Sequence, residues 1–325
     1  MLRHWPGPDD SLMERLTTFV SSRGLLKACG AHNNKPTSSA GHIAPELLAS
    51  HVPGGSIYVC THALANFAEH FVPRLREPFV LVSGDSDLPI SPRSLGHPAI
   101  KAILSSEYLL DWFAQNLSAD HSKLRPLPIG LDYHTMWETP GFWGLTAVSP
   151  ISQEHSLLAT LASSPPFSQR YLVGYCNWHF ALQRGDRTEC REKVDKSICY
   201  FEGKPVPRSS TWVRQAECMF VISPQGAGMD CHRTWEAIML GCIPVLKRNA
   251  MAPLLDGLPA LVVDDWQQVR RETLVDYASR VQAMKFDLSP LFRDSWARKI
   301  ARLPARDFPA MTLQEFRSCL TRVTG

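Results

Sequence analysis

The sequence predicts an α/β protein built from two Rossmann-like halves. Short apolar runs of strand type alternate along the chain with stretches of helical spacing, the order that builds parallel sheets from βαβ units. The chain has 325 residues, of which 44% are hydrophobic, which suits two globular domains of about 150 residues each. We expect an N-terminal domain over residues 1–140, a C-terminal domain over residues 141–300, and a C-terminal helix over residues 301–325 that could pack back on the first domain.

The first half opens on a predicted helix over residues 11–27, where apolar residues recur at helical spacing. Residues 29–55 are rich in Gly, Asn, Ser, Pro and His, so we expect mostly loop there. Strands are predicted over residues 56–60 and 78–83 with a helix between them, and a last strand within residues 123–131. Three stretches remain: a helical pattern over 98–105, residues 106–116 without a clear pattern, and an aromatic-rich linker over 132–150.

The second half alternates more regularly. Helical patterns and apolar strand-like runs follow one another without an internal repeat, as in a Rossmann-like domain. The predicted helices cover residues 152–162, 184–196, 209–217 and 231–240, and the predicted strands cover 171–176, 197–201, 219–222, 243–246 and 261–263, before three final helical stretches.

Composition argues against several functional classes. A net charge of +3 is too small to indicate binding to nucleic acid. Nine cysteines without a CxxC pair, several of them inside apolar runs, favour reduced and mostly buried thiols over disulfides or a zinc site. The first residues lack the apolar core of a signal peptide, and no run of about 18 apolar residues occurs. We therefore expect a soluble, cytoplasmic protein without stable membrane insertion.

The strongest motif is the unit over residues 218–248, a strand, a Gly-rich turn, a helix and a second strand. Gly226 and Gly228 can let a ligand approach the backbone. The helix that follows offers free N–H groups and a positive dipole end to an anion. Arg233 lies in its first turn, where a cation is unfavourable unless an anion offsets it. The unit therefore predicts a phosphate site.

Glu236 follows Arg233 by three residues, so both lie on roughly the same face of the helix. A carboxylate there can accept hydrogen bonds from the two hydroxyls of a ribose. The same spacing also allows a simple surface ion pair between the two residues. A dinucleotide fingerprint is less consistent with the motif, because a third glycine is missing and no acid stands near Leu246 to hold an NAD ribose.

Two carboxylates, Asp85 and Asp87, follow the predicted strand over residues 78–83. Ligands of open α/β sheets bind at this carboxyl edge, so Asp85 is our first candidate for a general base and Asp87 the second. An Asx-type turn that caps the loop is the structural alternative. His62 and His134 could also serve as bases or contact an acceptor, and Trp137 could stack on a sugar ring.

The run FVISPQGAGMDCHRTWEAIMLGCIPVL resembles the nucleotide-sugar-binding signature of exostosin-like glycosyltransferases, in particular the GT-B-fold enzymes encoded by large algal viruses. Residues 83–87, 112–116 and 128–131 are similar to that family more loosely. The resemblance implies two Rossmann-like domains that face each other across a cleft, with the nucleotide on the C-terminal domain. It also implies that Arg233 contacts the diphosphate and Glu236 the ribose. The predicted nucleotide-sugar site comprises Ser223, Gly226, Ala227, Gly228, Asp230, Arg233 and Glu236, with Arg184 and Arg187 as further diphosphate contacts.

These observations lead to one functional hypothesis and two alternatives. We expect an inverting glycosyltransferase that needs no divalent metal or other cofactor and moves a sugar from a nucleotide sugar, UDP-linked in our reading, to a glycan or glycoprotein acceptor on the first domain. Arginines and helix-end N–H groups would stabilise the leaving diphosphate, as the resemblance implies. The alternatives are an NADP-dependent oxidoreductase and a carbohydrate-binding protein that has lost catalysis.

Overall fold

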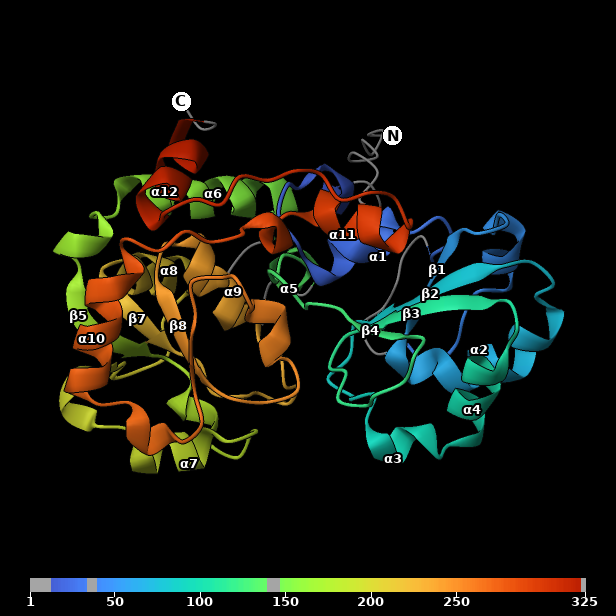
Figure 1. Cartoon of the computed structure of the whole chain (residues 1–325), viewed down its shortest axis with the longest axis horizontal. Coiled ribbons are helices and arrows are strands. Elements are labelled where there is room, and N and C mark those ends of the chain that lie inside the picture. The colour runs from blue at the N-terminus through green and yellow to red at the C-terminus, as the bar shows by residue number, and fades with distance from the viewer. Residues whose placement is uncertain (1–12, 34–39, 139–146, 323–325) are drawn as a thin grey trace, which may run out of the picture.

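The computed structural model describes residues 13–33, 40–138 and 147–322. It contains two parallel sheets that lie side by side, each covered by helices (Figure 1). The first sheet has the order β1-β2-β3-β4, with strands Ser56–Cys60, Phe79–Gly84, Leu109–Ala114 and Leu124–Pro126. The second has the order β6-β5-β7-β8-β9, with β5 Tyr171–Cys176, β6 Cys199–Phe201, β7 Cys218–Ile222, β8 Ile243–Lys247 and β9 Leu261–Val263. The predicted α/β class with two parallel sheets is confirmed.

Helices α2 (Leu64–His70), α3 (Pro92–Leu95) and α4 (Pro98–Ser105) belong to the first half. Its central strand, β2, is buried at every position, as expected for a parallel strand covered on both faces. Strand β3 lies in the stretch that showed no clear pattern, and Trp112 within it donates from Nε1 to the Ser83 hydroxyl at 2.8 Å. Asp111 interrupts the apolar residues of β3, so its sequence does not show a clean strand pattern.

The predicted helix over residues 11–27 is wrong as a single element. The structure has a 3-10 turn, η1 (Met13–Leu16), and a separate helix, α1 (Ser22–Ala28). Between them the chain is held by long-range backbone bonds: Val20 N–H donates to Leu291, and Leu131 N–H donates to Val20, both at 2.8 Å. These tertiary bonds override the local helical spacing, and the Ser21 side chain then caps α1.

The second half follows the predicted alternation closely. Its helices are α6 (Pro150–Ser163), α7 (Arg187–Lys193), α8 (Arg208–Ala216), α9 (His232–Met239) and α10 (Arg271–Val281). The strand order reverses between β5 and β7, because β6 lies on one side of β5 while β7, β8 and β9 follow on the other. The connections that leave the carboxyl ends of β5 and β7 therefore run to opposite sides of the sheet. This is a topological switch point, where such sheets bind ligands.

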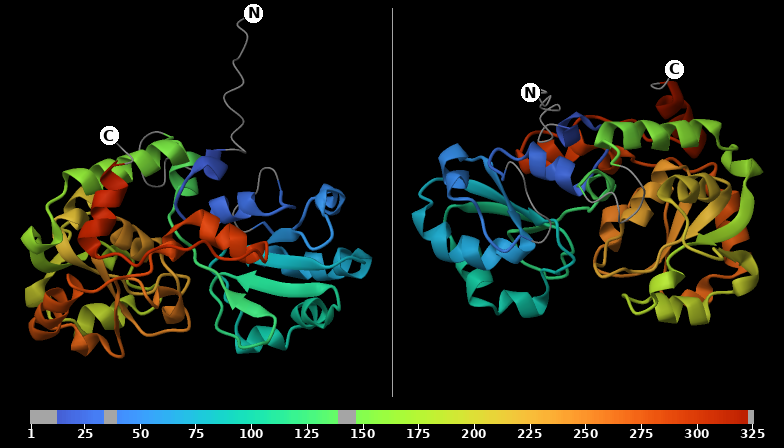
Figure 2. Two further views of the ribbon diagram at one scale, coloured as in Figure 1. Left: turned by 45° about the horizontal axis from the view of Figure 1, so that its top comes forward. Right: turned by 180° about the vertical axis from the view of Figure 1, so that it is seen from behind.

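The two halves are joined by more than one crossing of the chain. A short helix, α5 (His134–Glu138), follows the first sheet, and the predicted domain boundary at residues 140 and 141 lies outside the described residues. Helix α11 (Arg293–Ile300) contacts α1, whereas α12 (Leu313–Arg322) contacts α6 (Figure 2). The C-terminal part of the chain thus returns to the first half and then crosses back to the second.

The buried core also connects the halves. One cluster runs from Val82 and Phe113 of the first sheet into the second sheet at Phe220. A smaller cluster, which includes Phe67 and Ile103, lies between the first sheet and its helices α2 and α4. All nine cysteines are free thiols, most of them buried or half-buried, as predicted. Among the described residues, no helix is both long and apolar enough to cross a membrane.

Candidate functional site

Two loops meet at the switch point of the second sheet. One follows β5 and leads to α7, and the other is the Gly-rich turn between β7 and α9. They are bonded to each other, because Gln225 N–H donates to Asp186 Oδ1 at 2.7 Å, while Asp186 Oδ2 accepts from Trp266 Nε1 at 2.9 Å. The two loops therefore form one rigid rim at the carboxyl edge of the sheet.

Arg187 and Arg233 lie on this rim, close enough for their charges to interact. Arg187 donates to the backbone carbonyls of Gln225 and Trp178, both at 3.3 Å, and Arg233 Nη2 donates to Pro224 O at 3.3 Å. Burial and, after it, the charge of Arg233 lower the pKa of Arg187 to about 10. Within the part of the chain that the structure describes, neither guanidinium forms an ion pair.

Arg233 carries the clearest sign of a missing partner. Its Nε and Nη1 atoms are buried and have no hydrogen-bond partner among the residues that the structure describes. A buried donor without an acceptor costs about 1–3 kcal/mol, and more when it is charged, so an anion at this place would remove a real penalty. Arg184 is exposed in the same loop and also lowers the pKa of Arg187, so the structure brings the three predicted arginines together.

Contacts within the protein explain why the two positions in the turn are glycines. A Cβ at Gly228 would lie 2.9 Å from Asn116 Nδ2 in the first half, so Gly228 permits a close contact between the halves. A Cβ at Gly226 would lie 3.4 Å from Arg187 Nη2, so Gly226 leaves room for that guanidinium. Ala227 is exposed at the turn, and the buried Ser223 hydroxyl pairs with the Thr234 hydroxyl at 2.8 Å.

Asp230 is used by the protein itself. Its Oδ2 accepts from Ile129 N–H at 2.8 Å and its Oδ1 from Trp235 Nε1 at 2.9 Å, while its own N–H donates to Asn116 Oδ1 at 3.1 Å. Burial raises its pKa. Asp230 therefore connects the Gly-rich turn to the first half, and both of its carboxylate oxygens accept hydrogen bonds within the protein. Its contact with a nucleotide sugar stays a prediction.

Glu236 is buried one turn into α9 and has two partners on α8. Its Oε1 pairs with Arg208, and its Oε2 accepts from Trp212 Nε1 at 3.2 Å. Arg208 also donates to the Asp132 carbonyl oxygen and lies over the Trp212 ring at 4.8 Å. The surface ion pair between Glu236 and Arg233 that the spacing also allowed is not formed among the described residues. The ribose contact of Glu236 stays a prediction.

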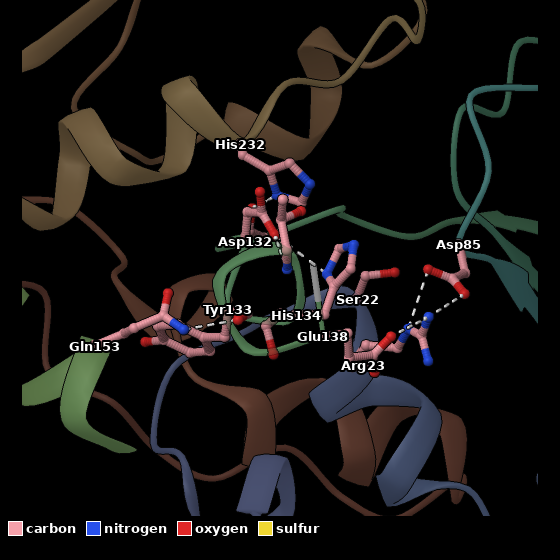
Figure 3. A network of polar contacts seen from close by, with 12 residues as sticks. Ser22, Arg23, Asp85, Asp132, Tyr133, His134, Glu138, Gln153 and His232 are labelled. Carbon is pink, nitrogen blue, oxygen red and sulfur yellow. Dashed lines mark hydrogen bonds and ion pairs between the residues drawn. The ribbon is translucent and has the colours of Figure 1, made fainter. Parts of the chain in front are cut away.

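Asp85 and Asp87 follow β2, as the sequence indicated, but in different environments. Asp85 has a positive φ of 56° and forms a buried ion pair with Arg23, whose Nε lies 3.2 Å from Oδ1 and whose Nη2 lies 3.2 Å from Oδ2 (Figure 3). Arg23 also lies 3.4 Å from Glu138. The Asp85 side chain is only 2% exposed, whereas Asp87 is exposed. In this conformation Arg23 occupies the Asp85 carboxylate, which is shielded from solvent.

The three remaining candidates differ in their exposure and their contacts. His62 is exposed directly after β1, in the 3-10 turn η3 (Thr61–Ala63), and Trp137 is half-buried in α5. His134 begins α5, and its Nδ1 lies 3.3 Å from Asp132 Oδ1. The His134 ring also lies 6.1 Å from the ring of His232, the first residue of α9. The sequence predicted a linker for this segment, so the contact between Asp132 and His134 was not expected.

A small pocket lies beside the Gly-rich turn, at the carboxyl ends of β7 and β8. Ser223, Gln225, Thr234, Lys247 and Asn249 contribute polar side chains to it. Across residues 13–33, 40–138 and 147–322, no group of three or more His, Cys, Asp or Glu side chains is arranged to hold a metal ion. Comparison with known protein-family models gave no match, and comparison with curated proteins gave none either.

Proposed function

We propose that the protein is a GT-B glycosyltransferase that takes a sugar from a nucleotide sugar, UDP-linked, and transfers it to a glycan acceptor with inversion. The observation that carries the proposal is the pair Arg187 and Arg233 at the switch point of the second sheet, with two buried donor atoms of Arg233 unpaired. A diphosphate is the ligand whose charge and several acceptor oxygens suit two guanidinium groups.

The chemistry of the transfer gives these arginines a role. The bond between the anomeric carbon and the diphosphate breaks, and negative charge develops on the leaving phosphate oxygen. Arg187 and Arg233 would stabilise that charge together with the free N–H groups at the start of α9. A side chain from the first half, predicted as Asp85 or Asp87, would take the proton of the acceptor hydroxyl. The proposal also includes a cleft between the two halves that admits the acceptor.

A thermal-shift panel tests the donor class directly. UDP, GDP, CMP and NADP would each be added to the purified protein, and the expected result is a rise in Tm with UDP. A shift with NADP and not with UDP would favour the oxidoreductase instead. Release of UDP from UDP-sugars, followed by NMR of the product, then tests transfer and its stereochemistry, and retention at the anomeric carbon would contradict the single displacement.

A carbohydrate-binding protein without catalysis is the second candidate, because the Arg23–Asp85 ion pair occupies the predicted base. It predicts binding of UDP-sugars without release of UDP, and no effect of Asp85→Asn on that binding. Turnover by the wild-type protein removes this candidate.

A further inference from the structure

We propose that His134, oriented by Asp132, is the general base that takes the proton from the acceptor hydroxyl. This inference rests on the proposed glycosyl transfer and names the residue that would perform its proton transfer. It replaces Asp85 in that role and leaves the donor site as described.

The position of His134 suits the role because it lies beside the start of α9. Figure 3 shows its ring between Asp132 and His232 on one side and the Arg23–Asp85 ion pair on the other. His232 immediately precedes Arg233, and the two imidazole rings are 6.1 Å apart. In this proposal, the sugar of a donor held at Arg233 lies on the side of α9 that His134 faces through His232.

Asp132 lies close enough to the imidazole to favour the tautomer that a base requires. Its Oδ1 lies 3.3 Å from Nδ1 of His134 and also accepts from Thr135 N–H at 3.0 Å. The nearby carboxylate favours a proton on Nδ1, and Nε2 then carries the free lone pair. The His134 side chain is 16% exposed, in contrast to the 2% exposure of the Asp85 side chain.

The surrounding charges keep the pair in the required states. Burial lowers the pKa of His134, and the charges of His232 and Arg23 lower it as well. The carboxylates of Asp132 and Asp85 raise this pKa, but the lowering effects together outweigh them. The imidazole is thus neutral at neutral pH and can accept a proton. Burial alone would raise the pKa of Asp132, but His134, His232 and the permanent charge of Arg208 outweigh it and hold that pKa below its usual range.

The proton transfer balances without another reactant. The acceptor oxygen forms a bond to the anomeric carbon as the bond from that carbon to the diphosphate breaks. The hydroxyl proton moves to Nε2 of His134, and the leaving diphosphate keeps the electron pair. The resulting imidazolium, stabilised by Asp132, then returns its proton to solvent.

The experiment uses the full chain and two separate measurements. UDP affinity is measured by calorimetry, and UDP release is measured with UDP-glucose, UDP-galactose, UDP-xylose and UDP-N-acetylglucosamine. We expect His134→Ala to bind UDP within about twofold of wild type and to lose about 10²-fold or more of its turnover, the usual contribution of a general base. Asp132→Asn should lose about tenfold or more. Exposed His155 on α6 provides the matched control, and His155→Ala should be unchanged.

A pH profile and chemical rescue separate catalysis from packing. His134→Ala should lose the acidic limb of the rate profile, and added imidazole should restore part of its turnover. Wild-type turnover in His134→Ala, or a loss that imidazole does not restore while UDP still binds, overturns the assignment and leaves the glycosyltransferase standing. If wild-type protein neither binds UDP nor releases it from any of the four sugars, the proposed function fails and the base assignment falls with it.

Discussion

Substitution of Arg233 by Met should stabilise the free protein and lower its affinity for UDP. The guanidinium makes one bond, to Pro224 O, and leaves Nε and Nη1 buried without partners beside a second charge on Arg187. Met keeps much of the volume and removes both the unpaired donors and the repulsion. Because such donors cost about 1–3 kcal/mol, the free variant should gain roughly that much, which is a Tm increase of about 2 °C or more for a domain of this size.

The same substitution should reduce the stabilisation that UDP provides. A charge-assisted bond contributes about 1.5–3 kcal/mol, so the Kd should rise about 10- to 150-fold. At UDP equal to about 100 times the wild-type Kd, wild type gains about 2.7 kcal/mol, whereas the variant gains about 1.4 kcal/mol or less. Differential scanning fluorimetry with and without UDP measures both effects in one experiment.

A suitable control is Arg280→Met, because Arg280 is exposed and pairs with Asp276 one turn away. It should leave the response to UDP unchanged. If Arg233→Met instead destabilised the free protein and kept the full UDP response, Arg233 would be a structural residue, and the argument from its unpaired atoms would be refuted.

Three further predictions use other parts of the structure. Burial raises the pKa of Glu14 from 4.5 to about 7, so its contribution to stability is largest below pH 4.5 and is lost as the pH rises through 7. Glu14→Gln should therefore be more stable than wild type at pH 8, by up to about 3 kcal/mol, and this advantage should shrink at pH 5 in urea titrations. Gly228→Ala should cost about 1–3 kcal/mol through its contact with Asn116, whereas Gly203→Ala, with nothing within 4 Å of the new Cβ, should not, and equal stabilities would contradict the close contact. The Tm shift with UDP should persist in EDTA, and recovery only with manganese would contradict the metal-independent proposal.

The sequence allowed most elements of the second half to be predicted because its strands are continuous apolar runs. Residues 171–176 and 261–263 were placed at their observed bounds. Strand β3 was missed because Asp111 interrupts its apolar residues, and only the fold supplies the partners Arg125 and Arg302 that explain this carboxylate. The helical spacing before α1 misled for the opposite reason, since bonds to residues distant in sequence decide the backbone there.

The candidate site divides in the same way. Arg233 could be predicted from local rules, because a cation in the first turn of a helix calls for an anion. The neighbourhood of Arg187 and Arg233 could not, because 45 residues separate them and only the order β5-β7 brings their loops together. For Glu236, the partners on α8 were also invisible to spacing. Asp132 and His134 are only two residues apart, but the aromatic residues around them led to the prediction of a linker there.

The Gly-rich turn has two tasks that constrain each other. Through Asp230 it is bonded to Asn116 and Ile129 of the first half, and Gly228 lies close to the Asn116 side chain. A few residues away, Arg233 leaves donor atoms unpaired among the described residues. An anion that pulled Arg233 toward itself would act on the same loop that holds the halves together. The bonds that link the halves and the proposed anion site therefore share one short segment of backbone.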